Sequence, residues 1–209
     1  MKSVRHWNPH YIVARSREML DQKLHPTDPW LTRESIDLLD QLLRPTDVAL
    51  EFGSGRSTRW IGRRVAHLTS VEHDEGWHET GLERLRKDKI DNIDLILKPL
   101  DVPEADGGSA AYVRILDGIA EGGLDFCLVD GMYRGYCAAG VVPKIKSGGM
   151  IAIDNAGWFL PSQSRTPGAR PPGSGTYDAA WDRFVASTDA WRRIWTTSGV
   201  TDTVIMFKP

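Results

Sequence analysis

From residue 47 onward the chain alternates short apolar runs with helical patterns, and this alternation constrains the fold more than any other feature. The apolar runs carry few polar residues, which is typical of strands buried on both faces of a parallel sheet. The sequence therefore predicts an α/β fold, a doubly wound, Rossmann-like and mostly parallel sheet. The expected strands are 48–52, 68–72, 93–97, 126–129 and 150–153, and the expected helices are 57–65, 75–89, 109–120 and 136–145.

The end of the chain departs from this alternation. A helical pattern at 177–187 is followed by strand patterns at 191–197 and 203–207, which flank Ser-Gly-Val-Thr-Asp and predict a hairpin. With the earlier strands this gives a seven-stranded sheet that ends in a C-terminal antiparallel hairpin. The residues near 158–176 are rich in proline, glycine and serine and cannot bury much apolar surface, so we expect a mobile loop there.

Residues 1–44 are expected to form an N-terminal arm with helices, a lid on the substrate side of a ligand-binding domain at 45–209. Helical patterns at 11–24 and 32–43 are separated by His25-Pro-Thr-Asp-Pro-Trp30, where each proline disfavours helix in its predecessor. The aromatic side chains of this arm, Trp7, Tyr11 and Trp30, are candidates to contact a small, partly apolar substrate, together with the turn Met132-Tyr133-Arg134 and the loop from Trp158 to Gly175. The alternative is that these aromatic residues only anchor flexible segments.

Composition narrows the classes of partner. A formal net charge of -2 and a pI near 6.3 offer no basic surface for a nucleic-acid backbone, so no nucleic-acid partner is expected. No apolar run approaches the roughly 20 residues that span a bilayer, and the start of the chain lacks an apolar signal core. Cys127 and Cys137 are too few for a disulfide scaffold. We therefore expect a cytoplasmic protein without a membrane partner, and a homodimer stays a hypothesis.

The chemistry of the chain is expected at the glycine turn Gly53-Ser54-Gly55, between the first strand and its helix. Glycines let a ligand approach the backbone, but the third glycine of the dinucleotide fingerprint is missing, and a purely structural turn is the alternative. Glu72 ends the second strand about 20 residues later, the offset at which an acid reaches ribose hydroxyls. Glu51 either bonds neighbouring backbone N–H groups or faces the amino group of a small zwitterionic cofactor.

Four ordered motifs make this interpretation more specific. They are Glu51-Phe-Gly-Ser-Gly55, Ser70-Val-Glu-His-Asp74, Leu128-Val-Asp-Gly131 and Gly148-Gly-Met-Ile-Ala-Ile-Asp-Asn155. With the terminal hairpin, they resemble class I S-adenosylmethionine-dependent methyltransferases over residues 45–209. The resemblance implies S-adenosyl-L-methionine as cofactor, bound by Glu51, Gly53, Ser54, Gly55, Glu72, His73, Trp77, Asp101 and Asp130. For Trp77 core packing is the alternative, and Asp101 contacts adenine or caps a local turn.

A second group of residues, Asp130 with Asp154 and Asn155, resembles the metal site of catechol-type O-methyltransferases. If the two strands are parallel neighbours, about 4.8 Å apart, the two carboxylates repel unless a proton or cation lies between them. A divalent cation such as Mg²⁺ is one solution. The other solution does not need a metal. The catechol-type family usually has a lysine base three residues after the first aspartate, whereas this chain has Tyr133 at that position and Arg134 beside it. Arg134 can neutralise an aspartate and make the metal unnecessary.

Methyl transfer requires a nucleophile placed in line with the methyl group, and a base if that nucleophile is a hydroxyl. The candidate catalytic residues are Asp130, Tyr133 and Arg134, with His10 and His25 of the arm as further candidate bases. We therefore predict a methyltransferase for a small-molecule acceptor, with O-methylation favoured. The alternatives are an NAD(P)-dependent Rossmann oxidoreductase and a non-catalytic protein with this fold. The sequence leaves open the acceptor, O- versus N-methylation, the base, the metal requirement and the oligomeric state.

Overall fold

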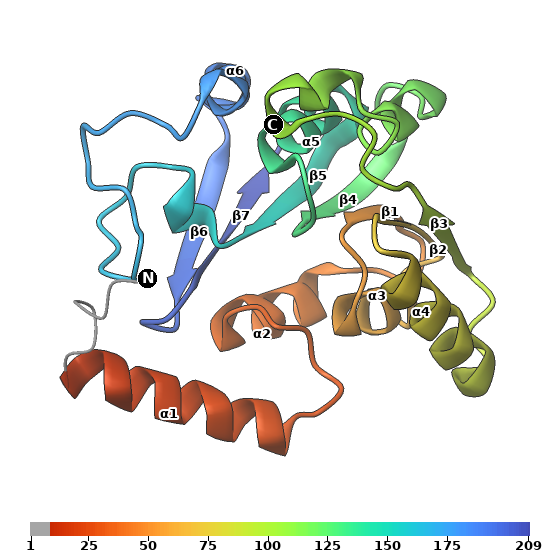
Figure 1. Cartoon of the computed structure of the whole chain (residues 1–209), viewed down its shortest axis with the longest axis horizontal. Helices are drawn as coiled ribbons and strands as arrows, with labels where there is room; N and C mark the ends of the chain where they lie inside the picture. Colours follow the sequence, from red (N-terminus) through yellow and green to blue (C-terminus); the bar gives the residue numbers. More distant parts are fainter. Residues whose placement is uncertain (1–8) are drawn as a thin grey trace.

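The computed structural model describes residues 9–209, so the first part of the predicted arm, with Trp7, lies outside the described residues. A seven-stranded sheet forms the centre of the molecule (Figure 1). The strands are β1 (Val48–Phe52), β2 (His67–Glu72), β3 (Ile93–Leu97), β4 (Leu124–Val129), β5 (Ile145–Asp154), β6 (Arg192–Thr197) and β7 (Asp202–Phe207). The α-helices are α1 (Pro9–Leu24), α2 (Arg33–Leu42), α3 (Arg56–Gly62), α4 (Glu75–Asp88), α5 (Arg134–Val141) and α6 (Ala179–Thr188). The 3-10 helices are η2 (Glu104–Ser109), η3 (Arg114–Gly118), η4 (Val142–Lys144) and η5 (Ala156–Trp158).

The strands lie in the order β3-β2-β1-β4-β5-β7-β6. Strands β1 to β5 pair in parallel with one another, and β7 pairs antiparallel with both β5 and β6. Phe52 is in register with Val129, and Val129 with Ile153, so β1, β4 and β5 end level with one another. The predicted α/β class, the mostly parallel seven-stranded sheet and its antiparallel C-terminal hairpin are confirmed. The loops that follow these strands therefore meet at one edge.

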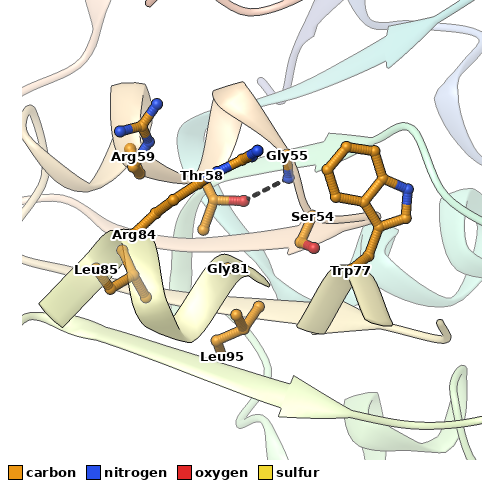
Figure 2. Close-up of a pocket in the computed structure, with 9 residues that line it drawn as sticks. All are labelled: Ser54, Gly55, Thr58, Arg59, Trp77, Gly81, Arg84, Leu85 and Leu95. Atoms are coloured by element: carbon orange, nitrogen blue, oxygen red, sulfur yellow. Dashed lines mark hydrogen bonds between the residues drawn. The ribbon is translucent and has the colours of Figure 1, made fainter. Parts of the chain in front are cut away.

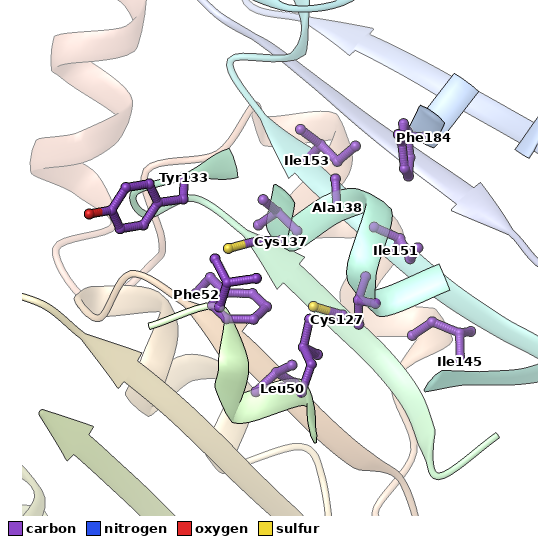
Figure 3. Packing of buried hydrophobic residues seen from close by; sticks show 14 of the residues in the cluster. Leu50, Phe52, Cys127, Tyr133, Cys137, Ala138, Ile145, Ile151, Ile153 and Phe184 are labelled. Atoms are coloured by element: carbon purple, nitrogen blue, oxygen red, sulfur yellow. The ribbon is translucent and has the colours of Figure 1, made fainter. Parts of the chain in front are cut away.

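Two layers of apolar side chains bury the faces of the sheet, because successive residues of a strand point to opposite sides. Val129 packs with Cys137 and Phe184 under α5 and α6, whereas Leu128 packs with Leu39 of α2 and the neighbouring α3. Figure 3 shows the first of these layers, with the side chains of Cys127 and Cys137 inside it. Both cysteines are free and buried.

The helix expected at 109–120 is not formed, and this prediction was wrong. The segment instead contains one short 3-10 helix, η3, and the 3-10 helix η2 ends at its first residue. Gly107 passes so close to the ring of Tyr133 that an added Cβ would lie 2.5 Å from it. The hydroxyl of Tyr133 donates to the carbonyl of Val102 at 2.5 Å. Tyr112, completely buried between η2 and η3, donates its hydroxyl to the carbonyl of Val71. Tertiary contacts of aromatic side chains therefore override the helical pattern of this segment.

The N-terminal helix α1 joins the rest of the protein through polar contacts. None of its residues is buried. Its inner face contributes Asp21, whose Oδ2 lies 2.9 Å from Nη2 of Arg33, and Glu18, which accepts from Ser198 at 3.3 Å. Within residues 9–209, no helix is long and apolar enough to cross a membrane. The role of the arm as a lid stays a prediction.

Side-chain hydrogen bonds connect the segment at 158–176 to the sheet. Asp202, at the start of β7, is buried and accepts from the hydroxyls of Ser164 at 2.8 Å and Thr166 at 2.6 Å. The indole N–H of Trp158 donates to the carbonyl of Pro167 at 3.0 Å. The mobility of this loop stays a prediction. Any movement of the loop would have to break these hydrogen bonds.

Candidate functional site

The glycine turn lies at the carboxyl edge of the sheet, between the ends of β1 and β4. The backbone of Gly53 has a φ of 92°, and a Cβ there would lie 2.7 Å from the Cα of Gly131, so only glycine fits. Gly53 N donates to the carbonyl of Val71, and Asp130 N donates to that of Phe52, both at 2.9 Å. The turn is therefore packed directly against the segment that follows β4, where Asp130 lies.

Glu72 holds the glycine turn in place. Its carboxylate Oε2 accepts from Ser54 N at 2.9 Å and from Ser54 Oγ at 2.6 Å, and Oε1 accepts from the backbone N–H groups of His73 and Asp74. Burial acts to raise the pKa of Glu72, but these hydrogen bonds outweigh it and leave the pKa below its usual value. Glu72 is therefore an ionised carboxylate whose acceptor positions are filled by the protein. The Ser54 hydroxyl is its one side-chain donor among these bonds.

Glu51 lies completely buried beneath the turn. Its Oε2 accepts from the hydroxyls of Thr58 and Ser70, each at 2.6 Å. Its Oε1 is buried and has no hydrogen-bond partner among the residues that the structure describes. Burial raises the pKa of Glu51 to about 7, against hydrogen bonds from hydroxyl groups, and the negative charge of Asp130 raises it further. A buried oxygen without a partner is costly, so this position favours a donor, above all a cationic one.

Two further predicted cofactor residues, His73 and Trp77, lie beside the turn. His73 Nδ1 lies 2.9 Å from Glu72 Oε1. Trp77 is 45% exposed rather than packed in the core, and Figure 2 shows its ring beside Ser54 and Gly55, at the slot between α3 and α4. The carboxylate of Asp101 accepts from Ala111 N at 3.1 Å, which is the local cap that the sequence left as the alternative.

Arg134, the first residue of α5, joins the ends of β4 and β5. Its Nε donates to the carbonyl of Gly131, and its Nη2 donates to the carbonyl and, at 2.8 Å, to Oδ1 of Asp130. Its Nη1 donates to the carbonyl of Asp154 at 2.8 Å and to Oδ1 of Asn155 at 3.1 Å. A guanidinium has five N–H donors, and here each is matched to a protein acceptor. Arg134 is therefore a fixed clamp rather than a group free to bind a substrate.

The clamp explains how two neighbouring aspartates are accommodated. Burial and the charge of Asp130 raise the pKa of Asp154 to about 8, while Arg134 and Thr203 act to lower it. Asp154 is therefore neutral near pH 7, and Arg134 balances the charge of Asp130. The proposed metal ligands Asp130, Asp154 and Asn155 are not supported as a metal site, because the arginine stands between them. No group of three or more His, Cys, Asp or Glu side chains that could hold a metal ion occurs within residues 9–209.

Among the candidate bases, Asp130 and Tyr133 differ in their surroundings. The hydroxyl of Tyr133 is committed to the carbonyl of Val102, and its ring is part of the core shown in Figure 3. Asp130 stands at the partly exposed end of β4, where burial raises the pKa of its carboxyl and Arg134 opposes that shift. His10 and His25 are both exposed residues of the arm, at the start and just past the end of α1.

An aromatic cavity lies beside the clamp, and the sequence indicated only part of its lining, the turn Met132-Tyr133-Arg134 and the loop from Trp158. It has a volume of about 220 Å³, and we call it the aromatic pocket; its lining includes Met132, Arg134, Trp158, Phe159, Tyr177 and Trp181. The rings of Phe159 and Trp181 are stacked, with centroids 4.9 Å apart. Trp158 was recognisable as an aromatic residue of the loop. Trp181 and Tyr177 come from α6 and the segment before it, and no local pattern indicates that they meet the loops after β4 and β5.

Comparison with known proteins places the chain by its fold. No model of a protein family and no curated protein sequence matches it. Among solved structures, it is similar to a candidate caffeoyl-CoA O-methyltransferase from Staphylococcus aureus (TM-score 0.58, 15% identity, 98% of this chain and 95% of that chain covered). An rRNA methylase from Streptococcus thermophilus gives a TM-score of 0.55 at 13% identity, with 84% and 94% covered. A candidate methyltransferase from Streptococcus mutans in complex with SAH gives 0.54 at 13% identity, with 84% and 96% covered.

These identities are low, and the likeness concerns the fold alone. The chain has the fold of class I methyltransferases, as the motifs at the ends of the strands predicted. The matched proteins differ in the acceptor that their names state, rRNA in one case and a CoA ester in another. The predictions on nucleic acid, oligomeric state and cellular location therefore stay predictions.

Proposed function

We propose that this protein is an S-adenosylmethionine-dependent methyltransferase that acts on a small-molecule acceptor, with oxygen as the favoured methylated atom. The observation that carries the proposal is the buried Oε1 of Glu51, which has no partner among the described residues although it lies beneath the glycine turn. Glu51 and Asp130 make this position negative. An ammonium group, as at the methionine end of the cofactor, provides the cationic donor that Glu51 requires. The SAH complex of a protein with the same fold is consistent with this assignment.

The residues of the turn fit the rest of the cofactor. Glu72 would hold the ribose, and the exchangeable partner is Ser54 Oγ, because the other bonds of Glu72 come from backbone N–H groups that fix the turn. His73 and Trp77 would flank the adenosine at the rim. When bound, the cofactor supplies a methyl group that its sulfonium already activates, so the protein contributes mainly position.

Asp130 is the group that we assign to the acceptor's proton. Its carboxyl stands at the end of β4, and Arg134 fixes it through Oδ1 at 2.8 Å. A raised pKa makes this carboxylate a stronger base near neutral pH. Asp130 would accept the proton of the acceptor's hydroxyl as that oxygen becomes the nucleophile. No divalent cation enters this proposal, because Arg134 supplies the positive charge between the strand ends.

Isothermal titration calorimetry tests the cofactor assignment. We expect the wild type to bind S-adenosylhomocysteine and not NAD(P), and Glu51→Gln to bind it at least about tenfold more weakly, since a charge-assisted hydrogen bond contributes about 1.5–3 kcal/mol. Because glutamine has the same shape as glutamate, a loss of binding in this variant reports the loss of the charge and not a change in packing. Binding of NAD(P) alone would replace the proposal by the oxidoreductase alternative. Cofactor binding without transfer to any of a broad panel of hydroxyl and amine acceptors would favour a non-catalytic protein.

A further inference from the structure

The aromatic pocket begins where the cofactor site ends. Gly131 and Met132 line the pocket, and Gly131 also packs against Gly53 of the glycine turn. A molecule in the pocket therefore lies next to the segment that carries Asp130. The volume of about 220 Å³ is below the roughly 300–1,000 Å³ of pockets that enclose drug-sized ligands, so the pocket suits one head group of a larger acceptor.

The charges of the pocket are predominantly negative. Its charged lining residues are Glu104, Arg134 and Asp178. Arg134 has its five N–H donors matched to protein acceptors and its charge balanced by Asp130, so it offers nothing to an incoming anion. Glu104 lies at the exposed rim, and Asp178 lies at the N-terminus of α6, which it caps through Oδ1. Among the lining residues of the pocket, an anionic head group would meet two carboxylates and no cation that lacks protein partners.

The rings of the pocket provide the complementary surface for a cation. Trp158 and Tyr177 are 46% and 52% exposed, and their ring centroids lie 6.5 Å and 5.6 Å from that of Phe159, both edge to face. Phe159 already has a cation beside it, since the guanidinium carbon of Arg134 lies 5.7 Å from its ring centroid. Aromatic faces attract cations, and more strongly where water is partly excluded. Exposed rings with carboxylates at the rim are the arrangement that binds an ammonium group.

We propose that the aromatic pocket binds a cationic ammonium group of the methyl acceptor, which anchors the acceptor while its nucleophile lies at Asp130. The proposal rests on the proposed function for its role, because the pocket is the acceptor side of a methyltransferase only if the glycine turn binds the methyl donor. It assigns the acceptor to amino- or quaternary-ammonium-bearing small molecules. It disfavours acceptors whose anchoring group is a phosphate, a CoA ester or a nucleic-acid backbone.

The test uses three probes of matched shape and different charge. Choline carries a quaternary ammonium, dimethylbutanol is its neutral carbon isostere, and dimethylbutyrate is an anionic analogue. Ligand-observed NMR titration of the wild type gives each dissociation constant, with methyl glucoside as a neutral sugar for comparison. We expect choline to bind at least about tenfold more tightly than its isostere, because cation–π contacts with more than one ring add to the attraction of the nearby carboxylates. Equal binding of choline and dimethylbutanol, or tighter binding of methyl glucoside, overturns the proposal.

Variants locate the binding in the pocket. Tyr177→Ala should weaken choline binding at least about threefold while Tyr177→Phe, which keeps the ring, retains it. Glu104→Gln should also weaken choline binding, whereas Glu121→Gln, an exposed carboxylate in the turn before β4, should not. Trp158→Ala is not the first choice, because its indole also bonds the loop. Choline binding that is the same in Tyr177→Ala and Glu104→Gln as in the wild type overturns the proposal.

Calorimetry with S-adenosylhomocysteine on the same samples separates the two proposals. If the wild type and Tyr177→Ala both bind S-adenosylhomocysteine but choline shows no preference over its isostere, the pocket assignment fails and the methyltransferase function stands. If choline is preferred but S-adenosylhomocysteine does not bind, the assignment of the pocket to a methyl acceptor fails with the proposed function.

Discussion

The buried carboxyl of Glu51 makes stability depend on pH in a defined direction. Burial raises its pKa from the ordinary value of 4.5 to about 7, against the hydroxyls of Ser70 and Thr58 that donate to Oε2. In the unfolded chain the pKa returns to 4.5, so between these values the folded state holds a proton that the unfolded state has lost. The stability contributed by neutral Glu51 is therefore fully present below pH 4.5 and disappears as the pH rises through about 7. At about 1.4 kcal/mol per pH unit, the loss amounts to about 3 kcal/mol.

Glu51→Gln removes this titration and keeps the size of the side chain. The difference in free energy of unfolding, variant minus wild type, should increase by about 3 kcal/mol as the pH rises from about 4 to about 8. Urea denaturation at a series of pH values gives this difference, and taking the difference cancels other titrating groups such as Asp154. Ser70→Ala is the control, because it keeps the carboxyl but removes one hydroxyl donor that lowers the pKa of Glu51; its stability should therefore fall with rising pH at least as much as that of the wild type. A difference between wild type and Glu51→Gln that is flat over this range would refute the burial argument.

Four further results are expected. Arg134→Lys should lower the free energy of unfolding in urea by about 3 kcal/mol, because an ammonium cannot replace the five-donor clamp; an equally stable variant would show the clamp to be dispensable. Gly53→Ala should abolish calorimetric binding of S-adenosylhomocysteine and lower stability by at least about 1–3 kcal/mol, since its φ of 92° and the approach of Gly131 exclude a Cβ. Asp202→Asn should speed limited proteolysis at 158–176 by weakening the bonds from Ser164 and Thr166, and unchanged cleavage would show that they do not control the loop. Thorough chelation should leave methyl transfer unchanged, whereas loss of activity restored by Mg²⁺ would show that Arg134 does not replace a metal.

The sequence was sufficient for the sheet because its signals are local. Runs such as 48–52 and 126–129 are continuous apolar segments that only a buried strand accommodates, and the turn sequence near Gly199 specifies the final hairpin. The glycine turn was identified in the same way, since Gly53 marks a position that a side chain would obstruct. Glu51 and Glu72 could be named from their spacing to that turn. Their different hydrogen-bonding states could not be predicted. Oε1 of Glu51 has no partner among the described residues, whereas the carboxylate of Glu72 accepts from several donors, and both facts depend on the folded structure.

The failures have a common physical cause, which is that long-range contacts decide the outcome. The segment 109–120 has a helical pattern, but Tyr112 is drawn into the core beneath Val71 and the chain forms two shorter turns. The aromatic pocket brings Met132 after β4 together with Trp158 after β5 and Trp181 in α6. These residues are separated in sequence and share no pattern, so only the order of the strands brings them together.

Arg134 shows how one side chain near a strand end determines the chemistry that this edge of the sheet can support. Tyr133 and Asn155 both adopt left-handed backbone conformations, with φ of 49° and 52°, so the chain turns sharply after each strand. These turns leave the carbonyls and side chains of the two loops facing one guanidinium, which reaches Asp130 on one side and Asn155 on the other. A metal ion at this edge of the sheet would exchange with solvent, and its affinity would depend on pH. The guanidinium of Arg134, in contrast, is part of the chain and carries its positive charge at every pH at which the protein is folded. The site thereby has a permanent counter-charge for Asp130, and the floor of the aromatic pocket is held in one geometry before any acceptor binds.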